Sequence, residues 1–200
     1  MSIYNYKPRD LLIEDDIIYC RPHHLETCST CDLNLAPLNS LHKSLLAIKG
    51  NIPPPNAVDQ YVSKQITGLK DEGNKLYNAQ SYNDAIKYYT TAIELAFQRP
   101  FWEPHEIAEQ DLAICLSNRA AAYIGLEDWV SAYVDAEFSN RIKENYPKGY
   151  FRKGKALMGM KKYQEAIKSF EIGLGLDLKN KEMKSALEEA TELLKKNYDE

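Results

Sequence analysis

Small and large apolar residues recur with a period of 34 residues between positions 66 and 180. Three copies result, 66–99, 113–146 and 147–180, with small side chains at the eighth, twentieth and twenty-seventh places of each. The eighth place holds Gly73, Ala120 and Gly154. The twentieth holds Ala85, Ala132 and Ala166, and the twenty-seventh holds Ala92, Ser139 and Gly173. Helices that cross closely need small side chains at the crossing. Each copy therefore predicts a hairpin of two helices, with turns at Gln80-Ser81, Glu127-Asp128 and Lys161-Lys162.

This period and pattern resemble the tetratricopeptide repeat. The copies depart from its consensus because none has the tryptophan of the fourth place or the proline of the thirty-second. Apolar residues at helical spacing continue through 181–197, where a capping helix is expected to cover the last hairpin. The predicted fold class is all-α: a solenoid of three helical hairpins and a C-terminal capping helix over residues 61–198, with a small N-terminal module.

The N-terminal module, residues 1–50, shows a different pattern. Residues 3–6 and 17–19 have strand-like composition, and residues 35–48 predict a short amphipathic helix that packs on the repeats or on a partner. Three consecutive prolines mark residues 51–60 as a stiff linker. We interpret the module as a part of the chain that binds a partner protein and lies outside the repeat core.

Four potential metal ligands are concentrated in this module. Cys20 and His23 are separated by two residues, and so are Cys28 and Cys31. Two such pairs can wrap one tetrahedral zinc ion, whose role would be structural because four protein ligands leave no position open for water. His24 is an alternative to His23. The four side chains are also compatible with ordinary reduced or solvated groups that bind no metal.

Composition excludes several classes of function. The 200 residues are 44% apolar and carry a formal net charge of −4, so no global basic field attracts nucleic acid. No apolar run approaches the ~20 residues that a membrane span requires, and the opening residues lack the apolar stretch of a secretory signal. We therefore expect a cytosolic protein with reduced or metal-bound cysteines, and Cys115 in the helical core.

Five polar residues fall on the first helices of the predicted hairpins, which line the concave face of such a solenoid. Lys70 and Asn74 share one side of the first of these helices, Lys148 and Arg152 share one side of the third, and Asn118 lies on the helix between them. Cations supply charge and asparagine N–H groups supply direction, which suits a carboxylate-rich peptide end. The alternative is that these are solvated surface cations and that Asn118 hydrogen-bonds between helices.

The segments LKDEGNKLY, LSNRAAAY and PKGYFRKGKAL resemble the dicarboxylate-clamp tetratricopeptide domains of chaperone partners. Domains of that family bind the Glu-Glu-Val-Asp tail of cytosolic heat-shock chaperones of the seventy- and ninety-kilodalton classes. Their clamp positions carry over onto five residues of this sequence: Lys70, Asn74, Asn118, Lys148 and Arg152. The resemblance covers residues 63–180.

A narrower resemblance, over residues 38–195, is to the tetratricopeptide subunit of the fungal Sec translocation complex of the endoplasmic reticulum. It rests on the stretches LNSLHKSLLAIKGNIPPPNAV and FQRPFWEPHEIAEQDLA together with the repeats. It implies a peripheral protein on the cytosolic face of that membrane, held by membrane-anchored Sec subunits. It also implies the seventy-kilodalton chaperones as the first ligand.

The leading functional hypothesis is thus a chaperone-docking adaptor for post-translational translocation. Two alternatives are a soluble cytosolic co-chaperone with no membrane role and a scaffold whose groove binds another peptide. No phosphate-binding glycine loop, nucleophile elbow or paired nucleophile and base occurs in the sequence, so we expect no enzymatic activity.

Overall fold

The computed structural model describes residues 11–47, 58–100 and 103–199. The chain divides into two compact units, with residues 11–47 in one and residues 58–99 and 103–199 in the other. The first unit is the N-terminal module and the second is the repeat domain. The predicted strand at residues 3–6 and most of the predicted linker lie outside the described residues.

The N-terminal module contains two small hairpins and one helix. Strands β1 (Leu11–Glu14) and β2 (Ile17–Cys20) pair antiparallel, with Leu11 opposite Cys20 and Glu14 opposite Ile17. Strands β3 (Thr27–Cys28) and β4 (Leu33–Asn34) form the second pair, and helix α1 (Ala36–Ala47) follows. The first hairpin turns through Asp15 and Asp16, which both have positive φ, as the primed turns of tight hairpins require.

The side chain of Asn39 anchors α1 to β2. Its Oδ1 accepts from the amide N–H of Ile18 at 2.7 Å, and its Nδ2 donates to the carbonyl oxygen of the same residue at 2.9 Å. Leu35 and Leu38 add apolar contacts to the module's core. The contacts described for α1 are therefore made within its own module. The sequence had left open whether this helix packs on the repeats or on a partner.

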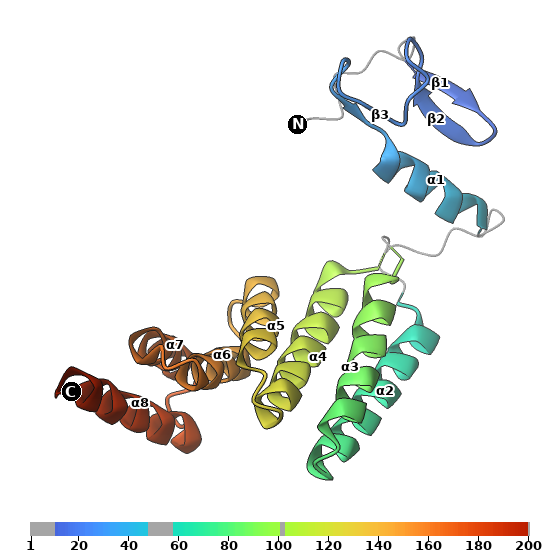
Figure 1. The fold of residues 1–200 in the computed structure, drawn as a ribbon. Helices are drawn as coiled ribbons and strands as arrows, with labels where there is room; N and C mark the ends of the chain where they lie inside the picture. The colour runs from blue at the N-terminus through green and yellow to red at the C-terminus, as the bar shows by residue number, and fades with distance from the viewer. Residues whose placement is uncertain (1–10, 48–57, 101–102, 200) are drawn as a thin grey trace. The chain divides into compact units, whose positions relative to one another are not determined.

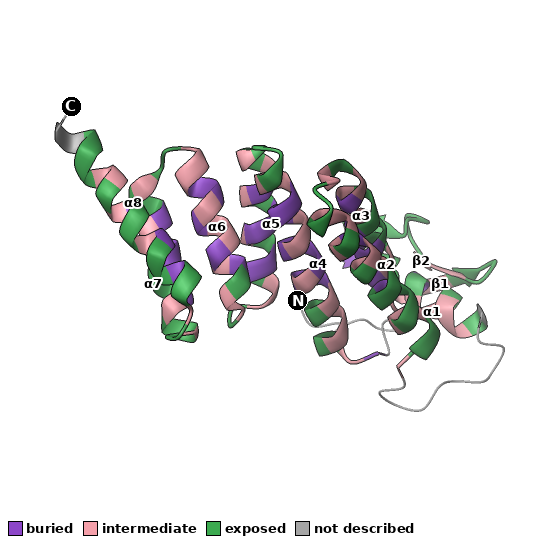
Figure 2. Ribbon diagram, turned by 90° about the horizontal axis from the view of Figure 1, so that it is seen from below, coloured by how far each residue is buried: buried purple, intermediate pink, exposed green. Residues whose placement is uncertain are grey.

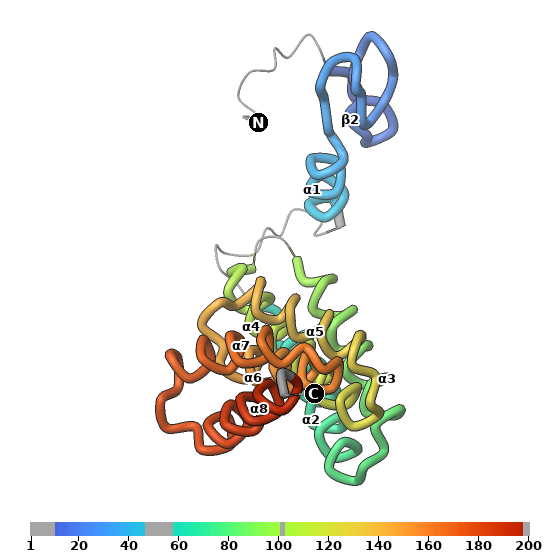
Figure 3. The backbone as a smooth tube through the Cα atoms, turned by 60° about the vertical axis from the view of Figure 1, so that its left-hand side comes forward, coloured from blue at the N-terminus to red at the C-terminus, as the bar shows by residue number. Residues whose placement is uncertain are grey.

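Seven helices make up the described part of the repeat domain (Figure 1). They form three hairpins and a final helix: α2 (Gln60–Asn78) with α3 (Tyr82–Phe97), α4 (His105–Gly125) with α5 (Trp129–Ile142), α6 (Pro147–Gly159) with α7 (Tyr163–Leu176), and then α8 (Lys181–Asp199). The tube in Figure 3 follows one hairpin into the next. The predicted all-α tetratricopeptide fold with a small N-terminal module is confirmed.

Each hairpin turns at a residue with positive φ that is not glycine: Gln80, Glu127 and Lys161. In the first turn, the amide of Ser81 donates to the carbonyl of Leu76, and the amide of Gln80 donates to that of Tyr77. The other two turns repeat this pair of hydrogen bonds. These bonds satisfy the last carbonyls of each first helix, so the helix can end and reverse without a glycine.

Small residues at the eighth place of a repeat make room for an aromatic ring from the partner helix. A Cβ added at Gly73 would lie 2.5 Å from the ring of Tyr89, and one at Gly154 would lie 2.3 Å from the ring of Phe170. Both rings are fully buried. Figure 2 shows buried residues concentrated where neighbouring helices of the solenoid face one another. Met183, Ala186 and Ala190 of α8 are buried against the last hairpin, as expected of a cap.

A buried ion-pair network ties the segment between α3 and α4 to α2. The Arg99 guanidinium contacts the carboxylates of Glu103 and Asp111, and donates to Ser63 Oγ at 3.0 Å. Glu103 also accepts from the amide of Asp59 at 2.8 Å, directly before α2 begins. The side chains of Arg99 and Glu103 are only 3% and 1% exposed. The insertion that separates the first two repeats is therefore held by charges that have little access to water.

Candidate peptide-binding groove

The first helices of the three hairpins form one continuous face. Helix α4 contacts both α2 and α6, and α6 contacts α8. The second helices α3, α5 and α7 do not contact one another to the same extent. The inner face of the solenoid is thus made by α2, α4 and α6, which carry all five residues predicted for the clamp.

Two asparagines from different repeats meet on this face. Asn118 Nδ2 donates to Asn74 Oδ1 at 3.1 Å, and the Tyr89 hydroxyl donates to the same oxygen at 2.8 Å. Burial raises the pKa of Tyr89 to about 12, so the phenol keeps its proton and remains a donor at neutral pH. Because the oxygen of Asn74 accepts both bonds, its Nδ2 group stays available for an acceptor in the groove.

A cavity of about 300 Å³ opens beside this pair. Its lining comes from both helices of the first hairpin and from α4 and α6, and consists of Asn74, Tyr77, Asn78, Tyr89, Asn118, Ala121 and Arg152. Three of the five predicted residues thus border one space. Lys70 and Lys148 are not among its lining residues, and each lies one helical turn before the predicted residue on its own helix.

The three predicted cations have no carboxylate partner among the described residues. Elsewhere in the repeat domain several cations are paired, as Lys153 is with Glu137 at 2.7 Å. Arg152 lies over the ring of its neighbour Phe151, 5.2 Å from the centroid, and remains half-exposed. Lys148 is exposed and Lys70 is half-buried. The inner face therefore carries positive charge that the described part of the chain leaves uncompensated, which favours an anionic ligand.

Sequence reasoning missed Tyr89, because its place in the repeat also serves the core. The ring is buried against Gly73, and only its hydroxyl reaches the inner face. The one signal available in the sequence was the hydroxyl group of Tyr89, a polar atom on a side chain that otherwise fits the apolar core. Asn118 also makes the inter-helix hydrogen bond considered as an alternative, so it has a structural partner as well as a place in the cavity.

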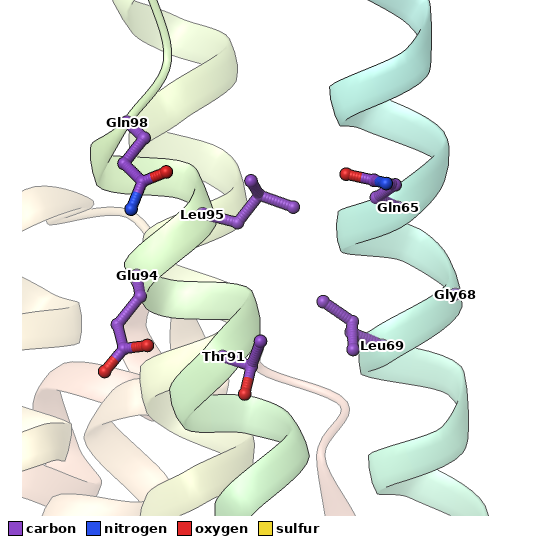
Figure 4. Close-up of a pocket in the computed structure, with 7 residues that line it drawn as sticks. All are labelled: Gln65, Gly68, Leu69, Thr91, Glu94, Leu95 and Gln98. Carbon is purple, nitrogen blue, oxygen red and sulfur yellow. The ribbon is translucent and has the colours of Figure 1, made fainter.

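A second cavity, of about 530 Å³, lies between α2 and α3. Figure 4 shows Leu69 and Leu95 pointing toward each other across it, flanked by Gln65, Thr91, Glu94 and Gln98. None of the five predicted clamp residues lines it. With one carboxylate and no cation in its lining, this cavity does not suit an acidic peptide.

The N-terminal module brings its four predicted metal ligands together. The ligand atoms of Cys20, His23, Cys28 and Cys31 all lie within 4.8 Å of one another. His23 Nδ1 is 3.6, 3.4 and 3.3 Å from the sulfurs of Cys20, Cys28 and Cys31. A zinc tetrahedron with bonds of about 2.0–2.3 Å has edges of roughly 3.3–3.8 Å. The donor set and its spacing therefore fit a tetrahedral ion such as zinc.

The alternative ligand, His24, is turned away from this cluster. Its Nε2 lies 2.8 Å from a Glu14 carboxylate oxygen, and its ring stacks on Tyr19. His24 has positive φ, which directs two consecutive histidines to different sides of the loop. The structure thus selects His23 as the fourth member of the cluster.

Cys28 and Cys31 have opposite pKa shifts. Burial opposes ionisation of Cys28, but hydrogen bonds from the Cys31 backbone, from the Cys20 and Cys31 side chains and from the Thr30 backbone lower its pKa overall. The pKa of Cys31 is raised to about 12, chiefly by the hydrogen bond with the Cys20 side chain.

Comparisons with known proteins agree with the fold and the repeats. Residues 147–180 match the model of the tetratricopeptide repeat family, with the bounds predicted for the third copy. Subunit sec67 of the ER protein translocation subcomplex of Schizosaccharomyces pombe is 35% identical over 142 residues, which cover 68% of this chain and 74% of that protein. The chain belongs to the sec67 family of tetratricopeptide repeat proteins. The resemblance seen in the sequence is thereby confirmed.

Two solved structures extend this comparison. A chain in the Saccharomyces cerevisiae Sec complex has the same fold, with a TM-score of 0.70 and 24% identity over 94% of this sec67-family chain and 98% of that chain. The second tetratricopeptide domain of human RPAP3, solved with the HSP70 peptide SGPTIEEVD, is 27% identical. Its TM-score is 0.55, and the match covers 65% of this chain and 98% of that domain.

Within the described residues of the sec67-family chain, every helix is too short or too polar to cross a membrane.

Replacing Tyr89 with Phe is expected to weaken binding of an acidic peptide about twofold to tenfold. The substitution removes one neutral hydrogen bond, worth about 0.5–1.5 kcal/mol, and frees the Asn74 amide to rotate. Fluorescence anisotropy with a labelled peptide measures the change. Tyr88→Phe, on the same helix at an exposed position, is the matched control. Equal affinities for the two variants would show that the Tyr89 hydroxyl does not orient the asparagine pair.

Proposed function

We propose that this protein docks the acidic C-terminal tails of cytosolic heat-shock chaperones, the seventy-kilodalton class first, through its inner-face groove. The observation that carries the proposal is the convergence of Asn74, Asn118 and Arg152 on one cavity, with Lys70 and Lys148 one turn away and no carboxylate partner described for any of the three cations. The likeness to a human domain solved with an HSP70 peptide ending in EEVD supports the same ligand.

The five residues have distinct roles in this proposal. Lys70, Asn74 and Asn118 bind the terminal carboxylate of the tail, while Lys148 and Arg152 bind the carboxylate of the last side chain. Each charge-assisted hydrogen bond contributes about 1.5–3 kcal/mol at best, and peptide ordering offsets part of the sum. We expect micromolar affinity, near −8 kcal/mol, which suits a docking step that must be reversible.

Membership of the sec67 family supports the proposed membrane role. The relative sec67 is named as a subunit of an ER protein translocation subcomplex, and the chain covers 74% of it. We propose that this protein acts at the cytosolic face of the endoplasmic reticulum, where membrane-anchored Sec subunits hold its N-terminal module and chaperones deliver completed precursors to its groove. It would act by binding alone, without enzymatic activity and without contact to nucleic acid.

A soluble co-chaperone with the same groove is the second candidate, because the RPAP3 domain that was solved with an HSP70 peptide matches 65% of this chain. Affinity purification from cells separates the two functions. Co-purification of membrane-anchored Sec subunits that is lost on deletion of residues 1–56 supports the translocation role. Recovery of chaperones without any Sec subunit supports the soluble role.

A peptide ending in Glu-Glu-Val-Asp, with a free or an amidated C-terminus, tests the groove directly. The free peptide is expected to bind, and amidation should remove most of its affinity because the terminal charge is lost. Equal affinity for the two peptides would show that the groove does not bind a free C-terminus. The protein would then be a scaffold that binds some other ligand.

We also propose that Cys20, His23, Cys28 and Cys31 hold one structural zinc ion. Three thiolates and one imidazole are a common set of structural zinc ligands, and they leave no open position for a substrate. Metal analysis of protein purified without chelator is expected to find one zinc per chain. A content near zero, with freely titratable thiols, would exclude the ion.

A further inference from the structure

The described part of the N-terminal module has few contacts that could stabilise its fold. It is described over residues 11–47, and its strands are at most four residues long. Isolated two-stranded hairpins are marginally stable in water, and domains below about 70 residues usually need a metal, disulfides, a partner or exceptional packing to fold. No disulfide is present among the described cysteines. The stability of the module must therefore come from a metal or a partner.

The core of the module overlaps the metal cluster. Among residues 11–47, the buried core residues are Cys20, Cys28, Leu33 and Leu35, and Leu11, Ile18, Cys31 and Leu38 pack against them. Two of the four buried residues are thus members of the ligand cluster. Without a bound ion, Cys20 and Cys28 contribute only two small thiols to this core, and the apolar surface left for burial comes from Leu33 and Leu35 with a few partly buried neighbours.

The cluster also joins the two hairpins of the module. Cys20 ends β2, Cys28 lies in β3, and Cys31 lies in the turn that leads into β4. His23 lies in the turn that the bond from the Cys20 amide to the Leu25 carbonyl closes at 2.9 Å. Helix α1 depends on the same framework, because Asn39 binds the backbone of β2 and the amide of Leu35 donates to the Glu26 carbonyl. One ion therefore cross-links both hairpins and fixes the surface on which α1 packs.

The repeat domain depends on none of these contacts. Its buried clusters around Ile66, Tyr89 and Phe170 contain no residue of the ligand set. Its one cysteine, Cys115, is buried in α4. Loss of an ion from the module leaves the cores of the solenoid intact.

We infer that the N-terminal module folds only when the Cys20, His23, Cys28 and Cys31 cluster holds a zinc ion, whereas the repeat domain folds without it. The inference rests on the proposed zinc site and adds a consequence to it. Attachment through the module requires zinc, and capture of an acidic peptide by the repeat domain does not. One chain thus carries two binding surfaces, one on the N-terminal module and one on the repeat domain. Only the surface on the module depends on zinc.

Hydrogen–deuterium exchange of the full-length chain, measured by mass spectrometry, tests this inference. The protein is compared as purified, after zinc removal by chelator in the presence of a phosphine reductant, and after zinc is added back. Removal is expected to abolish the protection of amides within residues 11–47, including that of Ile18, and zinc should restore it. Protection across residues 60–198 and the affinity for a Glu-Glu-Val-Asp peptide should stay unchanged.

Cys28→Ser supplies the matching variant and Cys115→Ser its control. The first is expected to lose both zinc and protection of the module, while the second keeps both. A module that stays protected after zinc is removed overturns the inference but leaves the zinc site standing. Absence of zinc from the purified protein overturns the site and the inference together, without bearing on the groove. Loss of protection in the repeat domain on zinc removal also overturns the inference.

Discussion

Reversing the charge of Arg152 to Glu should weaken binding of a Glu-Glu-Val-Asp peptide more than a hundredfold. Arg152 borders the cavity that contains Asn74 and Asn118, and it has no carboxylate partner among the described residues. Loss of a charge-assisted hydrogen bond alone costs about 1.5–3 kcal/mol, or roughly tenfold to over a hundredfold in affinity. The new carboxylate also repels an acidic tail, so the charge reversal should lower the affinity more than removal of the arginine contact alone.

Fluorescence anisotropy on wild type, Lys148→Ala, Arg152→Glu and a matched reversal measures these effects. Lys168→Glu changes net charge equally, but it lies exposed on α7 of the same hairpin and outside the cavity lining. We expect it to bind nearly as the wild type does. Lys148→Ala should cost at least about tenfold. Undiminished affinity in both groove variants would show that the groove does not bind the C-terminus of the peptide.

Added salt provides an independent check on the same charges. Exposed ion pairs are screened over a Debye length of about 8–10 Å at physiological ionic strength. The wild-type affinity should therefore fall as salt rises, and Arg152→Glu should show a weaker or reversed dependence. Helix content by circular dichroism should not differ among these variants, because the substituted side chains are not fully buried.

Replacing Arg99 with Met should lower the free energy of unfolding of the repeat domain by about 3–5 kcal/mol. The substitution leaves Glu103 buried without its cation and removes the bonds to Asp111 and Ser63. The bond from the Asp59 amide to Glu103 remains, but it does not replace the cation that offsets the desolvation of a buried carboxylate. Because domains are stable by only about 5–15 kcal/mol, this is a large fraction of the total.

Urea denaturation followed by circular dichroism measures this loss as a lower midpoint at unchanged slope. Lys87→Met breaks the exposed ion pair between Lys87 and Asp84, whose side chains are 75% and 50% exposed, and should leave the urea midpoint nearly unchanged. Similar losses in the two variants would show that the Arg99 network contributes no more than a surface pair.

The repeats could be predicted because their pattern repeats at fixed places. A small residue at the eighth place and large ones around it are local requirements of helix crossing, so Gly73 and Gly154 mark the hairpins without any coordinates. The period also assigns Lys70, Asn118 and Arg152 to the first helices, and in such a solenoid these helices share one face. The spacing of Cys28 and Cys31 likewise indicates a metal ligand pair.

Contacts between segments that carry no repeat pattern could not be predicted. His23 and His24 are adjacent and chemically identical, and the left-handed backbone at His24 together with Glu14 separates them. The anchoring of α1 on β2 depends on Asn39, whose partner lies 21 residues away.

The sequence alone therefore determined the hairpins, their order and the residue types on the inner face, because these follow from a regular period. Tertiary structure decided the identity of the fourth ligand, the bond from Tyr89 to Asn74 and the partners of Arg99. Each of these depends on distances between side chains of distant segments. Such distances arise only when the helices and turns have packed together, and no periodicity encodes them.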